Sequence, residues 1–437
     1  MKPELLSPVQ DFVSLKAAID TGADAVYFGI KELNMRIGAK NFELRDIKKV
    51  ITICHKNKVN AYFTLNTIIF DEEIDKIKKI LKMLKKEKID GIICWDFSVV
   101  KECEALRLPM HLSTQASVTN FESVLFLKNK IKNLKRINLA RELSLNQIKD
   151  IIIKIKKNKL NIEIETFIHG AMCLSISGRC FLSQEVFNKS ANRGECLQPC
   201  RRKYIIKDIE ENHEFELGED YVISPKDLCT IEFIDKLIDA GIDAFKIEGR
   251  NRSPEYVKVV TECYREAIDS LAQVKNNSTR ACEGRKVKQQ AQRAQSPLFK
   301  KDFIKKLEYS RELKNKLLKK LETVYNRGFS TGFYLGKPLN EWSGVYGSKA
   351  TETKVYLGKV LNYFKKVRVA LIKLETNDIC IGERVMFQGN NTGVFSQKAN
   401  SIQINNRNVK IAKKGSLVSI KTLKQVREND KVFLIKT

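Results

Sequence analysis

The sequence predicts an α/β protein: a (β/α)8 TIM-like barrel with a Cys-rich insertion, followed by a small all-β, barrel-like domain. Three observations predict it. Short apolar runs alternate with amphipathic stretches over the first 270 residues. A long cysteine-bearing stretch, Gly170–Leu228, then separates the seventh apolar run from its helix. After Val355 the pattern changes to the two-residue alternation of strands, with turn residues between them.

The predicted barrel strands are short, often β-branched and apolar on both faces, as buried parallel strands should be. They span Glu4–Leu6, Ala25–Phe28, Val59–Thr64, Gly91–Trp95, Met110–Thr114, Arg136–Leu139, Ile162–Ile168 and Ala244–Glu248. The predicted helices between them span Gln10–Thr21, Arg45–His55, Glu72–Glu87, Ser98–Leu106, Phe121–Lys130, Ser144–Lys157, Ile231–Ala240 and Pro254–Ser270. A doubly wound open sheet is the alternative, because alternation alone does not prove that the sheet closes.

The domain organisation follows from these changes of pattern. The barrel covers 1–274 and carries the insertion at 170–229, on the face where barrels place their active sites. Residues 275–301 hold eight basic residues and one acidic residue, which predicts a basic flexible loop. That loop is either a solvated linker or an RNA-contacting arm. A helical connector at 302–349, with one helix over Asp302–Asn326, leads to a small β-barrel domain at 350–437.

The charge balance favours a polyanionic partner. Lys and Arg number 79 and Asp and Glu 52, so the formal net charge is +27. RNA or DNA is the natural partner for such an excess, although a Lys-rich organism with a basic proteome would also explain it. No signal peptide and no membrane-spanning apolar run is visible, so we expect a soluble, cytoplasmic protein. In that reducing compartment the 11 cysteines argue for metal or redox chemistry instead of disulfides.

Cysteines gather in the insertion, at Cys173, Cys180, Cys196, Cys200 and Cys229. Thiolates repel one another, and a soft metal centre supplies the cation they need. Four sulfur ligands suit zinc or a [4Fe–4S] cluster. The six residues between the first two cysteines are long for a zinc pair, so the spacing favours iron–sulfur. The alternative is a set of ordinary buried thiols, which is how we interpret the scattered remaining cysteines.

Two further groups of residues fit a thiolate cage. Glycines in the insertion would let the backbone approach an inorganic core; these are Gly170, Gly178 and Gly194. Arginines beside the cysteines would offset their negative charge; these are Arg179, Arg193, Arg201 and Arg202.

Polar residues at or just past the predicted strand ends are the other candidates. They are Asn66, Gln115, Arg141, Glu142, Glu165, His169, Glu248 and Arg250. Arg141 and Arg250 would clamp a dicarboxylate by bidentate pairing. Glu142, Glu165 or His169 would move a proton. The alternative for each is a structural role in a polar layer of the barrel.

Several long motifs resemble the U32 peptidase family, whose name implies a collagenase-like protease. They are Glu165–Ser183, Asn192–Arg201, Ser224–Cys229, Lys246–Arg250 and Gly328–Phe333. The resemblance covers nearly the whole chain, apart from the basic segment around Lys275–Gln295.

The resemblance implies a function as well, through the family's tRNA 5-hydroxyuridine hydroxylation branch. Such relatives are oxygen-independent hydroxylation proteins that carry a [4Fe–4S] cluster and act on tRNA wobble uridine, ribosomal RNA cytidine or a quinone precursor. Prephenate is the implied source of the hydroxyl group in the RNA branch. Cys173, Cys180 and Cys196 carry over as cluster ligands. Either Cys200 or Cys229 completes the set, and we prefer Cys229 because it closes the loop back onto the barrel.

We therefore expect an iron–sulfur-dependent RNA hydroxylase that uses prephenate and acts on tRNA or rRNA, with a second U32-family subunit as an implied partner. A U32-type peptidase is the alternative, and a non-catalytic RNA-binding protein with a structural cluster is the third possibility. The sequence contains neither a His-Glu-x-x-His zinc motif nor a Gly-x-Ser-x-Gly elbow. A Cys173–His169 pair is conceivable, but it leaves four further cysteines unexplained.

Overall fold

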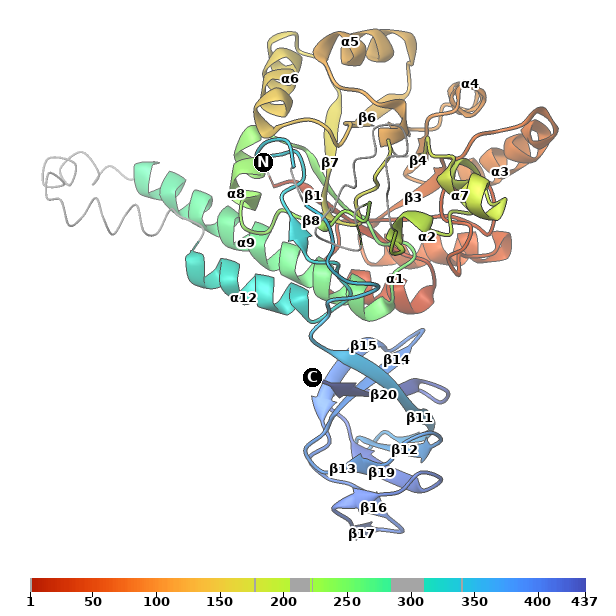
Figure 1. Cartoon of the computed structure of the whole chain (residues 1–437), viewed down its shortest axis with the longest axis vertical. Helices are drawn as coiled ribbons and strands as arrows, with labels where there is room; N and C mark the ends of the chain where they lie inside the picture. Colours follow the sequence, from red (N-terminus) through yellow and green to blue (C-terminus); the bar gives the residue numbers. More distant parts are fainter. Residues whose placement is uncertain (1, 177, 205–220, 222, 284–309, 339–340) are drawn as a thin grey trace, which may run out of the picture.

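The computed structural model describes the chain apart from residues 1, 177, 205–220, 222, 284–309 and 339–340, and residues 273–283 by their backbone alone. It confirms the closed parallel barrel (Figure 1). Seven strands pair in chain order, and β9 closes the ring by pairing in parallel with both β7 and β1. The open-sheet alternative is therefore excluded. The barrel strands are β1 (Glu4–Pro8), β2 (Ala25–Phe28), β3 (Asn60–Leu65), β4 (Gly91–Cys94), β5 (Met110–Leu112), β6 (Leu134–Asn138), β7 (Glu163–Gly170) and β9 (Ala244–Ile247).

Amphipathic helices surround the ring. In α2, for example, Ile47, Val50, Ile51 and Cys54 are buried on one face, at the spacing that a helix needs to cover a sheet. Side-chain caps fix the helix starts: Ser144 and Gln147 form a reciprocal capping box at α6. The helices are α1 (Phe12–Asp20), α2 (Ile47–Lys56), α3 (Ile74–Lys86), α4 (Phe97–Ala105), α5 (Phe121–Lys130), α6 (Leu145–Lys157), α8 (Ile234–Ala240) and α9 (Pro254–Glu283).

The insertion leaves the barrel and returns to it at the end of the same strand. It contains α7 (Leu182–Phe187) and the short 3-10 helices η4 (Ala191–Arg193) and η5 (Pro199–Arg201). It comes back through β8 (Asp227–Cys229), which pairs antiparallel with the last residues of β7, His169 opposite Cys229. The two-residue strand β10 (Phe329–Ser330) pairs in parallel with β8, so both lie outside the ring.

The predicted boundary at 275 is wrong. Helix α9 continues to Glu283, because neither glycine nor proline interrupts the sequence between Glu255 and Glu283. The rest of the predicted basic loop, 284–301, lies outside the described residues. The connector contains α12 (Arg311–Glu322), which ends earlier than the predicted Asp302–Asn326 helix; 302–309 also lie outside the described residues.

The C-terminal domain is all-β, as predicted. An eight-stranded sheet in the order β15-β14-β20-β11-β12-β19-β16-β17 encloses an apolar core, and a small β13–β18 pair lies beside it. Strands β15 and β17 lie at the two ends of this order, so the described residues do not form a closed ring of strands. The strands are β11 (Thr353–Phe364), β12 (Val369–Leu374), β13 (Ile379–Cys380), β14 (Arg384–Gly389), β15 (Gly393–Lys398), β16 (Gln403–Ile404), β17 (Arg407–Asn408), β18 (Ile411–Ala412), β19 (Leu417–Lys421) and β20 (Lys431–Lys436).

The β domain packs on the barrel through α1 and α9. Ala17 of α1 shares a small apolar cluster with Met386 and Val394. Beside it, the Glu255 carboxylate at the start of α9 pairs with Lys354 Nζ at 2.8 Å. In the described part of the chain, no helix combines the length and the apolar character needed to cross a membrane.

A buried ion cluster crosses the barrel interior. The Glu165 carboxylate accepts hydrogen bonds from Lys246 Nζ at 2.8 Å and Asn138 Nδ2 at 2.9 Å, and pairs with Arg136 at 3.4 Å. Burial alone would raise the pKa of Glu165, but the two cations outweigh it and hold that pKa below its ordinary value. These contacts favour the structural alternative for Glu165 over proton transfer: it is an anion that ties β6, β7 and β9 together.

We predict that Glu165→Gln lowers the free energy of unfolding by about 3 kcal/mol, because it leaves the buried Lys246 ammonium without its counter-charge, while Arg136 keeps Glu4 and Glu163. The measurement is urea denaturation of the whole protein. Glu142→Gln is the matched control, since Glu142 is exposed, and it should change stability by about 0.5 kcal/mol or less. Equal urea midpoints for the two variants would contradict a stabilising role for the ion cluster.

Candidate active site

A cavity of about 390 Å³ lies at the carboxyl end of the barrel. Strand-end residues such as Asn66, Gln115 and Glu248 line one side of it, and the insertion supplies the other. The predicted location of the site, at the barrel end that carries the insertion, agrees with this arrangement.

Four of the five insertion cysteines line this cavity together: Cys173, Cys180, Cys196 and Cys200. Cys229 does not. It is buried in β8, where its Sγ accepts a weak hydrogen bond from the Tyr264 hydroxyl at 3.8 Å. The preference for Cys229 as the fourth thiol is therefore not supported, because the strand that returns the chain to the barrel points this side chain toward α9. Cys200, the alternative, lies with the other three.

The insertion is held by hydrogen bonds close to the thiols. The buried Asn192 side chain accepts a hydrogen bond from the Cys180 backbone N–H at 2.9 Å, and Gln198 N–H donates to Cys196 Sγ at 3.4 Å. No three potential ligand side chains among the described residues stand at metal-ligand separations. The thiols thus share a cavity wall, and their chemical type fits a soft metal centre.

The glycines of the insertion pack closely against protein atoms. Gly194 has a φ of +89°, and a Cβ on it would lie 2.2 Å from the Asn34 carbonyl oxygen. A Cβ on Gly170 would lie 2.4 Å from the Glu248 carbonyl oxygen. Both glycines therefore allow the insertion to pack closely on the barrel loops, because a side chain at either position would collide with a backbone carbonyl oxygen.

Cations surround the thiols, though not all the predicted ones. Burial raises the pKa of Cys200, and the Arg201 guanidinium opposes that rise. Arg36 similarly opposes the burial that raises the pKa of Cys196. Among the other predicted arginines, Arg193 forms an ion pair with Glu73.

Arg36 was missed by the sequence reasoning. It comes from the irregular loop after β2, where no periodic pattern marks a functional residue, and pairs with Glu248 at 2.8 Å. Glu248 is held ionised: burial would raise its pKa, but Arg36, then Arg141 and Arg250, lower it below the ordinary value.

Arg141 and Arg250 both line the cavity, as the clamp prediction requires. The Arg250 guanidinium is buried and donates to Asn34 Oδ1 at 2.8 Å and Thr64 Oγ1 at 3.1 Å. Burial lowers the pKa of Arg250 to about 10, so it remains a cation at neutral pH.

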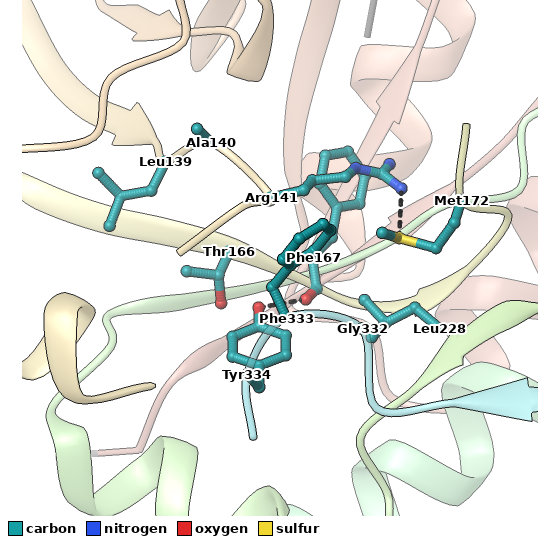
Figure 2. Close-up of a pocket in the computed structure, with 10 residues that line it drawn as sticks. All are labelled: Leu139, Ala140, Arg141, Thr166, Phe167, Met172, Leu228, Gly332, Phe333 and Tyr334. Carbon is teal, nitrogen blue, oxygen red and sulfur yellow. Dashed lines mark hydrogen bonds between the residues drawn. The ribbon is translucent and has the colours of Figure 1, made fainter. Parts of the chain in front are cut away.

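Figure 2 shows Arg141 over the Phe167 ring, 3.9 Å from its centroid, beside a smaller neighbouring cavity. Its Nη1 donates to the Ala171 carbonyl oxygen at 2.8 Å, and its buried Nε has no hydrogen-bond partner among the described residues. That free donor and the stacked guanidinium make Arg141 the better placed of the two arginines to bind a ligand.

The cavity wall also carries a linked pair of amides. Asn66 Nδ2 donates to Gln115 Oε1 at 3.0 Å, which leaves the buried Gln115 Nε2 without a partner in the described structure. Asn138 Oδ1 is likewise buried and unpartnered. A buried amide without a hydrogen bond is costly, so these groups are suited to bind a polar ligand.

The remaining proton-transfer candidates lie elsewhere. Glu142 is exposed in the loop after β6 and does not line the cavity. His169 is buried among Tyr256, Tyr264 and Phe329, with its Nδ1 3.3 Å from the Tyr264 hydroxyl. Burial, with Arg252 nearby, lowers the pKa of His169 to about 3, so the ring is neutral. Its position in β7 turns it toward α9 and Cys229, and away from the four cavity thiols.

Fold and site together define a TIM-like barrel protein with a cationic, thiol-lined cavity under an insertion. The family described as peptidase family U32 matches residues 10–314, and the chain belongs to that family.

Three relatives are similar over most of their length. The chain is 40% identical to an uncharacterized protease of Methanocaldococcus jannaschii, over 99% of this chain and 98% of the relative. It is 38% identical to a collagenase of Porphyromonas gingivalis, over 98% and 97%. It is 34% identical to tRNA hydroxylation protein P1 of Bacillus subtilis, over 89% and 84%.

Alkylation of the metal-free folded protein should separate the fifth cysteine from the other four. Burial raises the pKa of Cys229 to about 12, so at pH 8 only about one molecule in ten thousand carries the reactive thiolate. We expect iodoacetamide to modify Cys229 at least about a hundredfold more slowly than the exposed Cys173, by peptide mass spectrometry.

The rate at Cys229 should rise about tenfold with each pH unit above 8, since the thiolate fraction does. Cys263 is the internal control, because burial raises its pKa to about 12 as well. Modification of Cys229 as fast as that of Cys200 would show that it belongs with the cavity thiols.

Proposed function

We propose that this chain is an RNA hydroxylase, and more specifically that it forms 5-hydroxyuridine at the tRNA wobble position with prephenate as the oxygen donor. The observation that carries the proposal is the cavity: four thiols and an excess of cations line one space at the carboxyl end of the barrel. Its charged side chains, apart from the thiols, are seven Lys or Arg and two Glu. Such a wall favours anionic ligands, as a phosphate-bearing nucleotide and a dicarboxylate both are.

The donor set suits a [4Fe–4S] cluster held by Cys173, Cys180, Cys196 and Cys200. Such a cluster would supply one-electron chemistry when bound. Arg36 and Arg201 would then offset the charge of the thiolates that hold it. Arg141 would bind a carboxylate of the donor molecule through its free Nε and its Nη groups. The unpartnered Gln115 and Asn138 amides would fix the edge of a base by hydrogen bonds.

A peptidase is the second candidate, favoured by the names of two of the relatives. A cysteine protease needs a thiolate beside a histidine. Of the histidines in the described part of the chain (His55, His111 and His169), none lines the cavity with the cysteines. The relative named for tRNA hydroxylation supports the RNA proposal instead.

We expect anaerobically purified protein to hold about four irons per chain, and Cys200→Ala to lose most of them. Cys229→Ala should keep its iron, because its thiol lies outside the cavity. Iron and sulfide analysis of both variants is the measurement. Loss of iron from Cys229→Ala alone would instead identify Cys229 as the fourth ligand.

Deleting the gene should remove 5-hydroxyuridine-derived nucleosides from tRNA digests, and only an allele with Cys200 should restore them. Nucleoside mass spectrometry measures both. Unchanged digests would refute the tRNA assignment. Gelatin cleavage by pure protein, abolished by Cys200→Ala, would favour the peptidase.

A further inference from the structure

A group of exposed cations and apolar side chains covers one end of the C-terminal β sheet. Residues 350–437 carry 17 Lys and Arg against 6 Asp and Glu, a large excess for so small a domain. The cations gather where the turn between β11 and β12 meets the ends of β15 and β19. We call this group the turn patch; it comprises Lys365, Lys366, Arg368, Lys398, Lys421 and Lys424, with Phe364, Val367 and Leu423.

Backbone and side-chain hydrogen bonds bring these residues together from three segments. Thr422 N–H donates to the Arg368 carbonyl oxygen at 2.8 Å, which joins the β11–β12 turn to the end of β19. Gln397 then bridges to β15: its Nε2 donates to the Lys421 carbonyl oxygen, and its Oε1 accepts from Leu423 N–H, both at 2.7 Å. The turn patch is thus a fixed surface of the folded domain.

The cations of the turn patch are not neutralised by neighbouring acids. None of the six forms an ion pair with the part of the chain that the structure describes, whereas three of the six acids of the domain pair with other cations. Those pairs are Glu352 with Arg384, Glu375 with Lys359, and Asp378 with Lys413. The excess positive charge therefore remains open to an external polyanion.

Exposed apolar side chains lie among the cations of the turn patch. Phe364 is 46% exposed, Val367 59% and Leu423 74%. Single exposed apolar residues are ordinary, but an aromatic ring among unpaired cations offers both phosphate contacts and a face on which a base can stack. The turn patch also lies away from the barrel interface: Val394 of β15 packs against α1, and Lys398 is at the other end of that strand.

We propose that the turn patch is an RNA-docking surface that binds the phosphate backbone of the substrate RNA and stacks an unpaired base on Phe364. The inference rests on the proposed function, because it takes the substrate to be an RNA. The barrel cavity then needs to hold only the reacting nucleotide, and the turn patch supplies affinity for the rest of the molecule.

The test uses the full-length protein and an unmodified tRNA transcript, with affinity measured by fluorescence anisotropy between 50 and 300 mM salt. The variant K365Q/K366Q/R368Q removes three charges from the turn. The control K82Q/K85Q/K86Q removes three from the exposed face of α3, where these lysines are also unpaired among the described residues. Thermal unfolding of each variant checks that the fold is kept.

We expect the turn variant to bind the transcript about tenfold to a hundredfold more weakly, and the slope of log affinity against log salt to fall by about two. The control should bind like the parent protein. Phe364→Ala should weaken binding about tenfold and leave the salt slope unchanged, because stacking releases no counterions.

Equal binding by the turn variant and its control would overturn the proposal. Loss of binding to anionic phosphatidylserine vesicles, with tRNA binding intact, would identify a membrane surface instead. The assay measures binding without turnover, so it separates the two proposals. Patch-dependent binding with unchanged tRNA digests in the deletion strain would refute the proposed function alone; patch-independent binding with 5-hydroxyuridine lost would refute the docking surface alone.

Discussion

The structure depends on β9, the strand that closes the barrel. It hydrogen-bonds to β1 and β7 at once, and it brings Lys246 into the interior opposite Glu165. Past its end, the same strand places Glu248 and Arg250 on the cavity wall. The strand that closes the ring therefore also builds part of the site. The Lys246–Glu165 ion pair holds β9 in the barrel, and the position of β9 in turn determines where Glu248 and Arg250 lie on the cavity wall.

The balance of charge explains why so many cations surround the cavity. Four thiols that share a wall would repel one another as thiolates, and burial already disfavours ionisation at Cys196 and Cys200. Arg36 and Arg201 supply the opposing charge from two different parts of the chain. Arg36 is itself held in place by Glu248, so the thiol wall and the strand-end wall form a single electrostatic unit.

Much of the fold could be predicted from the sequence, because buried parallel strands and amphipathic helices have distinct patterns. The site was harder to predict, because it depends on the direction in which each side chain points. Strand position alone did not show that Glu165 points into an ion cluster, that His169 faces α9, or that Cys229 turns away from the other thiols. Arg36 lies in an irregular loop and gave no signal. Asn66, Gln115, Arg141, Glu248 and Arg250 were found because residues at the ends of parallel strands meet at one edge.

The antiparallel pairing of His169 with Cys229 anchors both ends of the insertion to a single strand. Because the insertion starts and ends at the same strand, it forms no part of the ring of barrel strands. Its length can therefore change at small entropic cost, about 0.6 kcal/mol for each doubling of a flexible loop, without shifting any barrel strand. Such a module offers a route by which one barrel could host different lids, and hence different substrates, on an unchanged base.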